Sequence, residues 1–286
     1  YYHLSVNTSV LDGLGTTSLV VRASWSAGRP YHAAANLTVN IKVIKRPSRL
    51  EILVSPSPAS YGEIVSFVFA FTDALTDEHV AIAQSDFAIY NHLELLDPSN
   101  YTVIQNGRTF EIHINTTVLS DVLVYNRNLT VVVTWPGGVP YYDDSSASTQ
   151  VSIVPRDTIV SVSPPINTAH AENATFTFKF IDVTGGSSTV VAYDAARMTI
   201  ATNLTETPSI NYEPSTREFT VSFNTAQFGG IGIKALYFNV TWAGRPYYAN
   251  RTGTVVRVTV TLRQTILEFD TPDPTPFGDT VTFTVR

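Results

Sequence analysis

Apolar and polar residues alternate along much of the chain with a period of two residues. Residues 175–180 read Thr-Phe-Thr-Phe-Lys-Phe, and residues 255–260 follow a similar pattern. This period is typical of half-buried strands, whose successive side chains point to opposite faces of a sheet. No apolar stripe recurs every 3.6 residues over a dozen residues, so long helices are not expected. The pattern therefore predicts an all-β chain.

A segment that contains tryptophan occurs three times, at residues 22–38, 130–144 and 239–252. The three tryptophans of the chain lie in these segments, 110 and 107 residues apart. Recurrence over such a length predicts tandem domains of one type.

The repeat extends on both sides of each tryptophan. A strand precedes the tryptophan, an alternating strand follows it, and the next repeat opens with a strand, a proline-rich turn and a second strand. Repeats of about 100 residues with turns between short strands suit an immunoglobulin-like (Ig-like) β-sandwich of about seven strands. The expected boundaries are the C-terminal part of one module at 1–45, whole modules at 46–155 and 156–263, and the N-terminal hairpin of another module at 264–286.

Each tryptophan is followed by a turn with glycine and proline and then by tyrosine. We interpret this element as a hairpin corner that aromatic rings hold in place, with Phe238, Val240 and Trp242 facing the core. The expected structural residues are Trp25, Trp135, Trp242, Pro30, Pro140, Pro246, Tyr31, Tyr141 and Tyr247. An alternative is a sugar-stacking platform made of Trp242, Tyr247 and Tyr248. The middle copy has Val139 in place of Arg245, which favours the structural interpretation.

Composition excludes some classes of partner. Charged residues make up 15% of the chain and the net charge is −6, which gives no case for nucleic-acid binding. No apolar run reaches membrane-spanning length, so no membrane span is expected in this segment.

Nine Asn-X-Ser/Thr sequons occur among 16 asparagines, more than chance predicts, which favours an exported, N-glycosylated chain. They are Asn7, Asn36, Asn100, Asn115, Asn128, Asn173, Asn203, Asn239 and Asn250. The alternative explanation is that Asn and Thr simply favour turns and strands. Cysteine is absent, which suits an extracellular sandwich and a cytosolic protein equally, so the prediction of an extracellular location rests on the sequons.

The sequence offers little reactive chemistry. No two of the six histidines have a metal-ligand spacing, and no G-x-S-x-G elbow or repeated carboxylate pair is present. Calcium at the module openings is an alternative, because Asp270 and Asp273 lie near one of them, but the other openings hardly carry carboxylates. We therefore predict no catalytic residue, no metal site and no cofactor.

The corner and the opening that follows it together carry a family resemblance. Its residues are Trp242, Gly244, Pro246, Tyr247, Tyr248 and Asn250, followed by Pro274, Pro276, Gly278 and Asp279. Over essentially the whole chain, this pattern resembles the Ig-like repeats of very large archaeal cell-surface proteins. The resemblance implies a secreted, glycosylated, non-enzymatic surface role and supplies no ligand.

The two end pieces allow two arrangements. Adjoining modules of a longer polypeptide complete them, or the tail of one copy completes the head of the next by strand complementation. The second arrangement is a head-to-tail contact that would build a filament.

The function expected from the sequence is that of an extracellular fibre, stalk or coat, whose partners are copies of itself or adjoining modules. The alternative is an adhesin that binds glycans or another cell. A carbohydrate-active enzyme would require a cleft with paired carboxylates.

Overall fold

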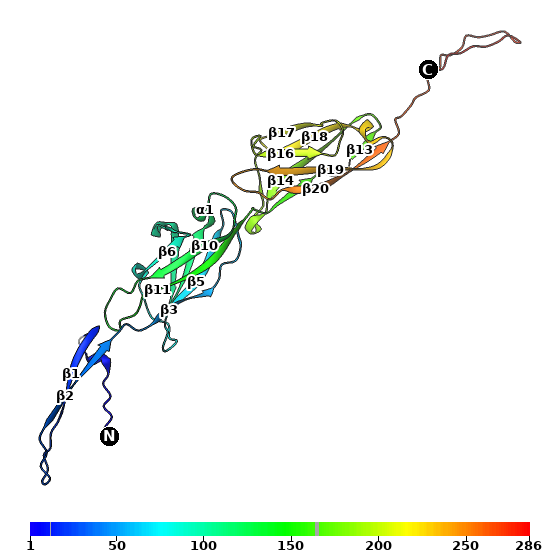
Figure 1. Cartoon of the computed structure of the whole chain (residues 1–286). Coiled ribbons are helices and arrows are strands. Elements are labelled where there is room, and N and C mark those ends of the chain that lie inside the picture. The colour runs from blue at the N-terminus through cyan, green and yellow to red at the C-terminus, as the bar shows by residue number, and fades with distance from the viewer. Residues whose placement is uncertain (12, 164–165) are drawn as a thin grey trace. The chain divides into compact units, whose positions relative to one another are not determined.

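The computed structural model describes residues 1–11, 13–163 and 166–286 (Figure 1). Strand accounts for 51% of the chain and helix for 7%, which confirms the all-β prediction. The α-helix α1 (Thr116–Leu119) is a single turn, and the other described helical segments are short 3-10 turns. The chain divides into two compact units, Tyr1–Pro155 and Arg156–Arg286.

The first unit contains a sandwich of two sheets, which we call module 2 (residues 46–155). One sheet has the order β3-β5-β9-β8 and the other β4-β11-β10-β6-β7. The strands of the first sheet are β3 (Ser48–Val54), β5 (Ile64–Asp73), β9 (Thr109–Asn115) and β8 (Tyr101–Asn106). Those of the second are β4 (Ala59–Ser60), β11 (Ser145–Val154), β10 (Val124–Val133), β6 (Phe87–Asn91) and β7 (Glu94–Leu95).

The second unit contains a similar sandwich, which we call module 3 (residues 156–263). One sheet has the order β12-β14-β18-β17, with β15 beside β14, and the other has the order β13-β20-β19-β16. The strands of the first sheet are β12 (Thr158–Val162), β14 (Asn173–Asp182), β18 (Glu218–Asn224), β17 (Ser209–Glu213) and β15 (Thr189–Val190). Those of the second are β13 (Ile166–Ala169), β20 (Arg251–Thr261), β19 (Gly232–Trp242) and β16 (Met198–Thr202).

Both modules have immunoglobulin topology. The opening segment of each one contributes first to one sheet and then to the other, where β4 and β13 pair in parallel with the last strand of their module. The remaining ladders described in the two modules are antiparallel. This arrangement of strands defines an Ig-like β-sandwich and confirms the predicted fold class.

Phenylalanines from the two-residue pattern fill both cores. In module 2 the stacked rings of Phe69 and Phe110 have centroids 5.3 Å apart. In module 3 Phe178 and Phe219 occupy the same register positions, with centroids 4.8 Å apart. The same cross-strand ring pair therefore anchors the β5–β9 and β14–β18 ladders.

The two end pieces leave apolar side chains exposed. In residues 1–45, η1 (Thr8–Val10) precedes the antiparallel hairpin of β1 (Gly15–Ala23) and β2 (Ala35–Val43). Val21 is 36% exposed, whereas Phe238, its counterpart in module 3, is buried. In residues 264–286, where we predicted the N-terminal hairpin of a module, an antiparallel bridge pairs Phe269 with Val285, and the amides of Glu268 and Arg286 donate to each other's carbonyls at 3.0 and 2.8 Å.

Candidate functional site: the repeated aromatic corner

The tryptophan segments form the turns that link β1 to β2, β10 to β11 and β19 to β20. Trp242 is the last residue of β19, and Trp25 and Trp135 each lie two residues beyond their strand. The peptide bonds before Pro30, Pro140 and Pro246 are all cis. The cis proline is therefore common to all three copies of the corner, and the turn of the third copy is one residue shorter.

The indole of each tryptophan closes its own turn. The three Nε1–H groups donate to the carbonyl oxygens of Gly28, Gly138 and Gly244, at 3.0, 3.4 and 3.1 Å. Gly138 and Gly244 have φ of 98° and 82°, a region that residues with a Cβ rarely adopt. The backbone of these two turns thus explains the need for glycine there.

A second ring meets each indole edge-on. Tyr248 lies 5.0 Å from Trp242 between ring centroids, Tyr142 lies 4.9 Å from Trp135, and in the first copy His32 lies 5.2 Å from Trp25. These are the residues that follow Tyr247, Tyr141 and Tyr31, the tyrosines named from the sequence. Tyr247 and Tyr141 contribute their backbone carbonyls instead, as the next paragraphs describe.

Behind the second ring of modules 2 and 3 lies an arginine–aspartate pair that the sequence analysis missed. In module 2 the Nε and Nη2 atoms of Arg46 lie 2.8 and 2.5 Å from Oδ2 of Asp73, and the Tyr142 hydroxyl donates to the same oxygen at 3.3 Å. In module 3 Nε of Arg156 lies 2.7 Å from Oδ2 of Asp182. We call each set of arginine, aspartate and second tyrosine the arginine clamp.

The backbone of the same arginine also pairs with the corner. The amide of Arg46 donates to the carbonyl of Tyr141, and the amide of Arg156 donates to the carbonyl of Tyr247, both at 2.7 Å. The arginine carbonyls accept from Asp143 at 3.0 Å and from Ala249 at 2.8 Å. The first residue of each module is therefore held to its last turn by both backbone and side chain. The signal in the sequence was the recurrence of Arg46, Arg156 and Arg263 at the tryptophan spacing.

The electrostatics of the clamp favour a fixed ion pair. Burial by itself acts to raise the pKa of Asp182, but hydrogen bonds from Thr184 and Arg156 outweigh it, and the pKa lies below its ordinary value. The pKa of Asp73 is lowered in the same way, by Leu75 and Arg46 against burial. Burial and the neighbouring aspartate raise the pKa values of Tyr142 and Tyr248. The carboxylates thus stay ionised and the phenols stay protonated around neutral pH.

One predicted glycosylation residue also supports the corner. The amide of Trp242 donates to Oδ1 of Asn250 at 2.8 Å, and the amide of Trp135 donates to Oδ1 of Asp144 at 2.9 Å. The corresponding position of the first copy is Ala34. An acceptor here satisfies an amide at the end of a strand, and either Asn or Asp provides it.

Most of the predicted glycosylation asparagines lie at the surface. Asn128 and Asn239 are half-buried within strands, and the other seven are exposed: Asn7, Asn36, Asn100, Asn115, Asn173, Asn203 and Asn250. The side-chain amide of Asn115 donates to the carbonyl of Gly62 at 3.2 Å, so its nitrogen is already engaged. The occupancy of the nine sequons stays a prediction.

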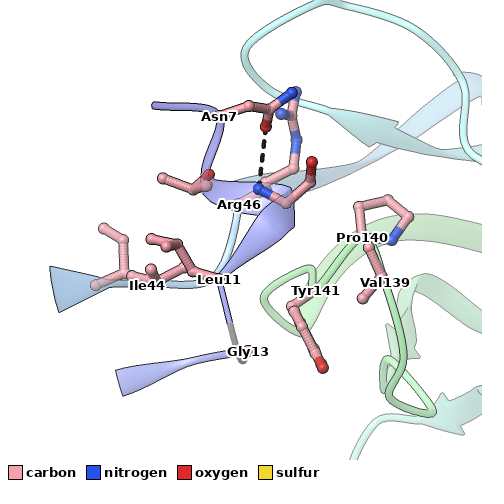
Figure 2. A pocket seen from close by; sticks show the side chains of 11 residues that line it. Asn7, Leu11, Gly13, Ile44, Arg46, Val139, Pro140 and Tyr141 are labelled. Atoms are coloured by element: carbon pink, nitrogen blue, oxygen red, sulfur yellow. Dashed lines mark hydrogen bonds between the residues drawn. The ribbon is translucent and has the colours of Figure 1, made fainter. Parts of the chain in front are cut away.

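A hollow of about 170 Å³ lies beside the module 2 corner (Figure 2). Figure 2 shows Asn7, Leu11, Arg46 and Tyr141 around it. Of the residues that the structure describes, no Asp, Glu or His lines it. Among the described residues, no group of three or more His, Cys, Asp or Glu is placed to hold a metal ion. Within the described ranges, no helix is long and apolar enough to cross a membrane.

Comparison with known proteins shows no family relationship for this chain. No protein-family model matches the chain, and no curated protein matches it significantly. Among solved structures, the chain is similar to the N-terminal Ig1-2 module of the Drosophila receptor protein tyrosine phosphatase DLAR, with 11% identity over 75% of this chain and 100% of that chain, and a TM-score of 0.25. It is similar to a marsupial T cell receptor, with 9% identity over 85% and 80% of the two chains and a TM-score of 0.34. It is also similar to domains 4–9 of the surface layer protein SbsC, with 11% identity over 90% of this chain and 36% of that chain, and a TM-score of 0.24.

Proposed function

We propose that this chain is a structural segment of an extracellular surface protein, in which glycosylated Ig-like modules in series build a filament, stalk or coat. The observation that carries the proposal is the arginine clamp. In modules 2 and 3 alike, an arginine, an aspartate and a tyrosine at equivalent positions hold the first residue of the module to its last turn. Because the polar atoms of this repeated element bind one another, the element stabilises the module that contains it.

The chemistry of the corner supports a mechanical role over a catalytic one. Its carboxylates are ionised and paired, its phenols keep their protons, and its indole N–H groups are used by the turn itself. None of these groups is set to exchange a proton near neutral pH. The proposed role is therefore mechanical, and the modules in series set the length of the segment.

The extracellular location is supported by the nine sequons and by the resemblance to archaeal cell-surface repeats. Glycans on the exposed asparagines would cover part of the polar surface of each module. Either adjoining modules of a longer polypeptide or another copy of the chain would complete the pieces at 1–45 and 264–286. An intact mass near 31 kDa plus glycans favours head-to-tail complementation, and a several-fold larger mass excludes it.

Electron microscopy of intact source cells tests the function. Gold-labelled antibodies raised against residues 46–263 should decorate a filament, lattice or coat outside the cell envelope. Exclusively intracellular labelling would refute the proposal. Mass spectrometry of the native polypeptide should find glycans on the exposed sequons.

The second candidate function is that of a glycan-binding adhesin, because the corner aromatics are only partly covered. Trp25 is 49% exposed, and Trp242 is half-buried. A glycan array separates the two functions. Binding that disappears in a folded Trp242→Phe or Tyr247→Ala variant supports the adhesin, whereas absence of binding leaves the structural role.

A further inference from the structure

The outer face of β19 carries an apolar pair where the matching face of module 2 is polar. Tyr237 pairs with Val255 of β20, and the two residues are 48% and 46% exposed. The counterpart of Tyr237 in module 2 is Thr130, which lies at the same distance before its tryptophan. Thr130 pairs with Ser148, and their hydroxyl oxygens are hydrogen-bonded 2.9 Å apart. Module 3 thus presents a phenol ring and a valine to solvent where module 2 pairs two hydroxyls.

The sequon asparagine Asn239 lies on the same face of β19, two residues from Tyr237. Successive side chains of a strand point to opposite faces, so both residues point away from the core in which Phe238 is buried. The neighbours of Asn239 on the adjacent strands are small, namely Ala201 of β16 and Gly253 of β20. A Cβ placed on Gly253 would meet no atom within 4 Å from the described chain beyond its two neighbours. The sheet surface beside Asn239 therefore has room for an attached group.

A hydrogen bond fixes the orientation of the Asn239 amide. Its Oδ1 accepts the backbone N–H of Gly253 at 2.7 Å, and Nδ2 could not accept it. In the described part of the chain, Thr72 has the one buried side-chain polar atom that lacks a hydrogen-bond partner. Nδ2 of Asn239 also lacks a partner there, so this atom is accessible to solvent. In module 2, by contrast, Nδ2 of Asn115 donates to the carbonyl of Gly62.

We propose that Asn239 carries an N-linked glycan whose first sugar packs on the ring of Tyr237. This proposal rests on the proposed function of a glycosylated extracellular protein, and it makes Tyr237 a sugar-binding residue of module 3. A pyranose has a face of C–H groups that packs on the negative face of an aromatic ring, while its hydroxyls stay in water. Module 2 has Thr130 and Val132 at the two positions, and therefore lacks both the ring and the sequon.

The modification requires a transferase and a sugar chain that is activated on a lipid phosphate, both supplied by the secreting cell. Nδ2 of Asn239 forms a bond to the anomeric carbon of this donor. The bond from that carbon to the phosphate oxygen breaks, the phosphate leaves with its electron pair, and a base of the transferase takes one proton from Nδ2. Thr241 supplies the hydroxyl of the sequon.

Hydroxyl-radical footprinting of the 1–286 chain tests the contact. Mass spectrometry of the chain from secreting cells should find a glycan on Asn239. The Tyr237 ring should be oxidised several-fold more slowly in this chain than in the same chain from a host without N-glycosylation. Tyr193 is the internal control, because it is 41% exposed and its ring contacts Tyr212 and Phe219. Its oxidation should change little between the two forms.

Variants measure the contact through stability. Thr241→Val removes the sequon and keeps the Asn239 side chain with its hydrogen bond. In the glycosylated chain this change should lower the midpoint of the module 3 thermal transition by roughly 2–4 °C, the effect expected of one stacked ring. The loss should disappear in a Tyr237→Leu background and in the unglycosylated chain, and it should persist in a Tyr193→Leu background.

Each possible result decides the proposal. Equal oxidation of Tyr237 in the two forms, or the same effect of Thr241→Val in the folded Tyr237→Leu chain, would overturn it. Glycans on the exposed sequons but not on Asn239 would overturn it and leave the proposed function standing. A secreted chain without a glycan on any sequon would contradict both.

Discussion

Replacing Arg156 with methionine should destabilise module 3 and leave module 2 unchanged. The substitution keeps much of the apolar stem but removes the cation from Asp182, which is 4% exposed. Removing one partner from a buried ion pair typically costs about 3–5 kcal/mol, because the other charge stays buried. The Arg156 side chain keeps 18% of its surface exposed, and Thr184 still donates to Asp182 at 3.0 Å. We therefore expect a loss of about 3 kcal/mol in the free energy of unfolding, the low end of that range.

Differential scanning calorimetry of the 1–286 chain measures this effect with an internal reference. At about 4 °C for each kcal/mol, the transition of module 3 should fall by roughly 12 °C, while that of module 2 stays in place. Arg257→Met is the matched control, because Arg257 is exposed on β20. The double variant Arg156→Met with Asp182→Leu should regain most of the loss, since no charge is then left unpaired.

The reasoning would be refuted by a loss below about 1 kcal/mol, the value of an exposed ion pair. It would also be refuted if the double variant were less stable than Arg156→Met, because the cost would then lie elsewhere than in the unpaired carboxylate.

Three further predictions concern the same framework. The clamp aspartates have lowered pKa values, so their contribution to stability is present above about pH 4 and is lost as the pH falls below that value. An acid titration followed by circular dichroism should show this loss of stability. In the Asp182→Asn variant, the stability of module 3 should depend less on pH over the same range. Asn250→Asp keeps the acceptor for the Trp242 amide and should change stability little, whereas Asn250→Ala should cost about 1 kcal/mol in urea unfolding. Among the described residues, the buried hydroxyl of Thr72 has no hydrogen-bond partner, and module 3 has Ile181 at this register. Thr72→Val should therefore raise the urea midpoint of module 2, and a lower midpoint would contradict the assignment.

The sequence predicted the fold class because strands and corners leave local signals. The two-residue period indicates which side chains face the core, and the glycine and proline after each tryptophan indicate a turn. Phe238 and Val240 are buried as expected. Trp242 is only half-buried, because it ends β19 at the rim of the sandwich, where the period still holds but the opposite sheet covers less of the side chain.

The arginine clamp could not be derived from local pattern. Arg156 and Asp182 are 26 residues apart, and only the pairing of β12 with β14 and of Arg156 with Tyr248 brings them together. Tyr247 and Tyr248 point to different sides of the backbone, and the sequence alone does not determine which of the two rings meets the indole.

The central claim is that residues 46–155 and 156–263 form two self-contained Ig-like sandwiches in series. Separate expression of residues 46–155 and 156–263, followed by urea unfolding and amide hydrogen exchange, tests it most directly. Each segment should unfold in one cooperative transition, with protected amides along its core strands and a midpoint close to that of the same module in the whole chain. If either segment alone is unfolded, or if both unfold in a single transition only when joined, the modules are not independent units and the account fails.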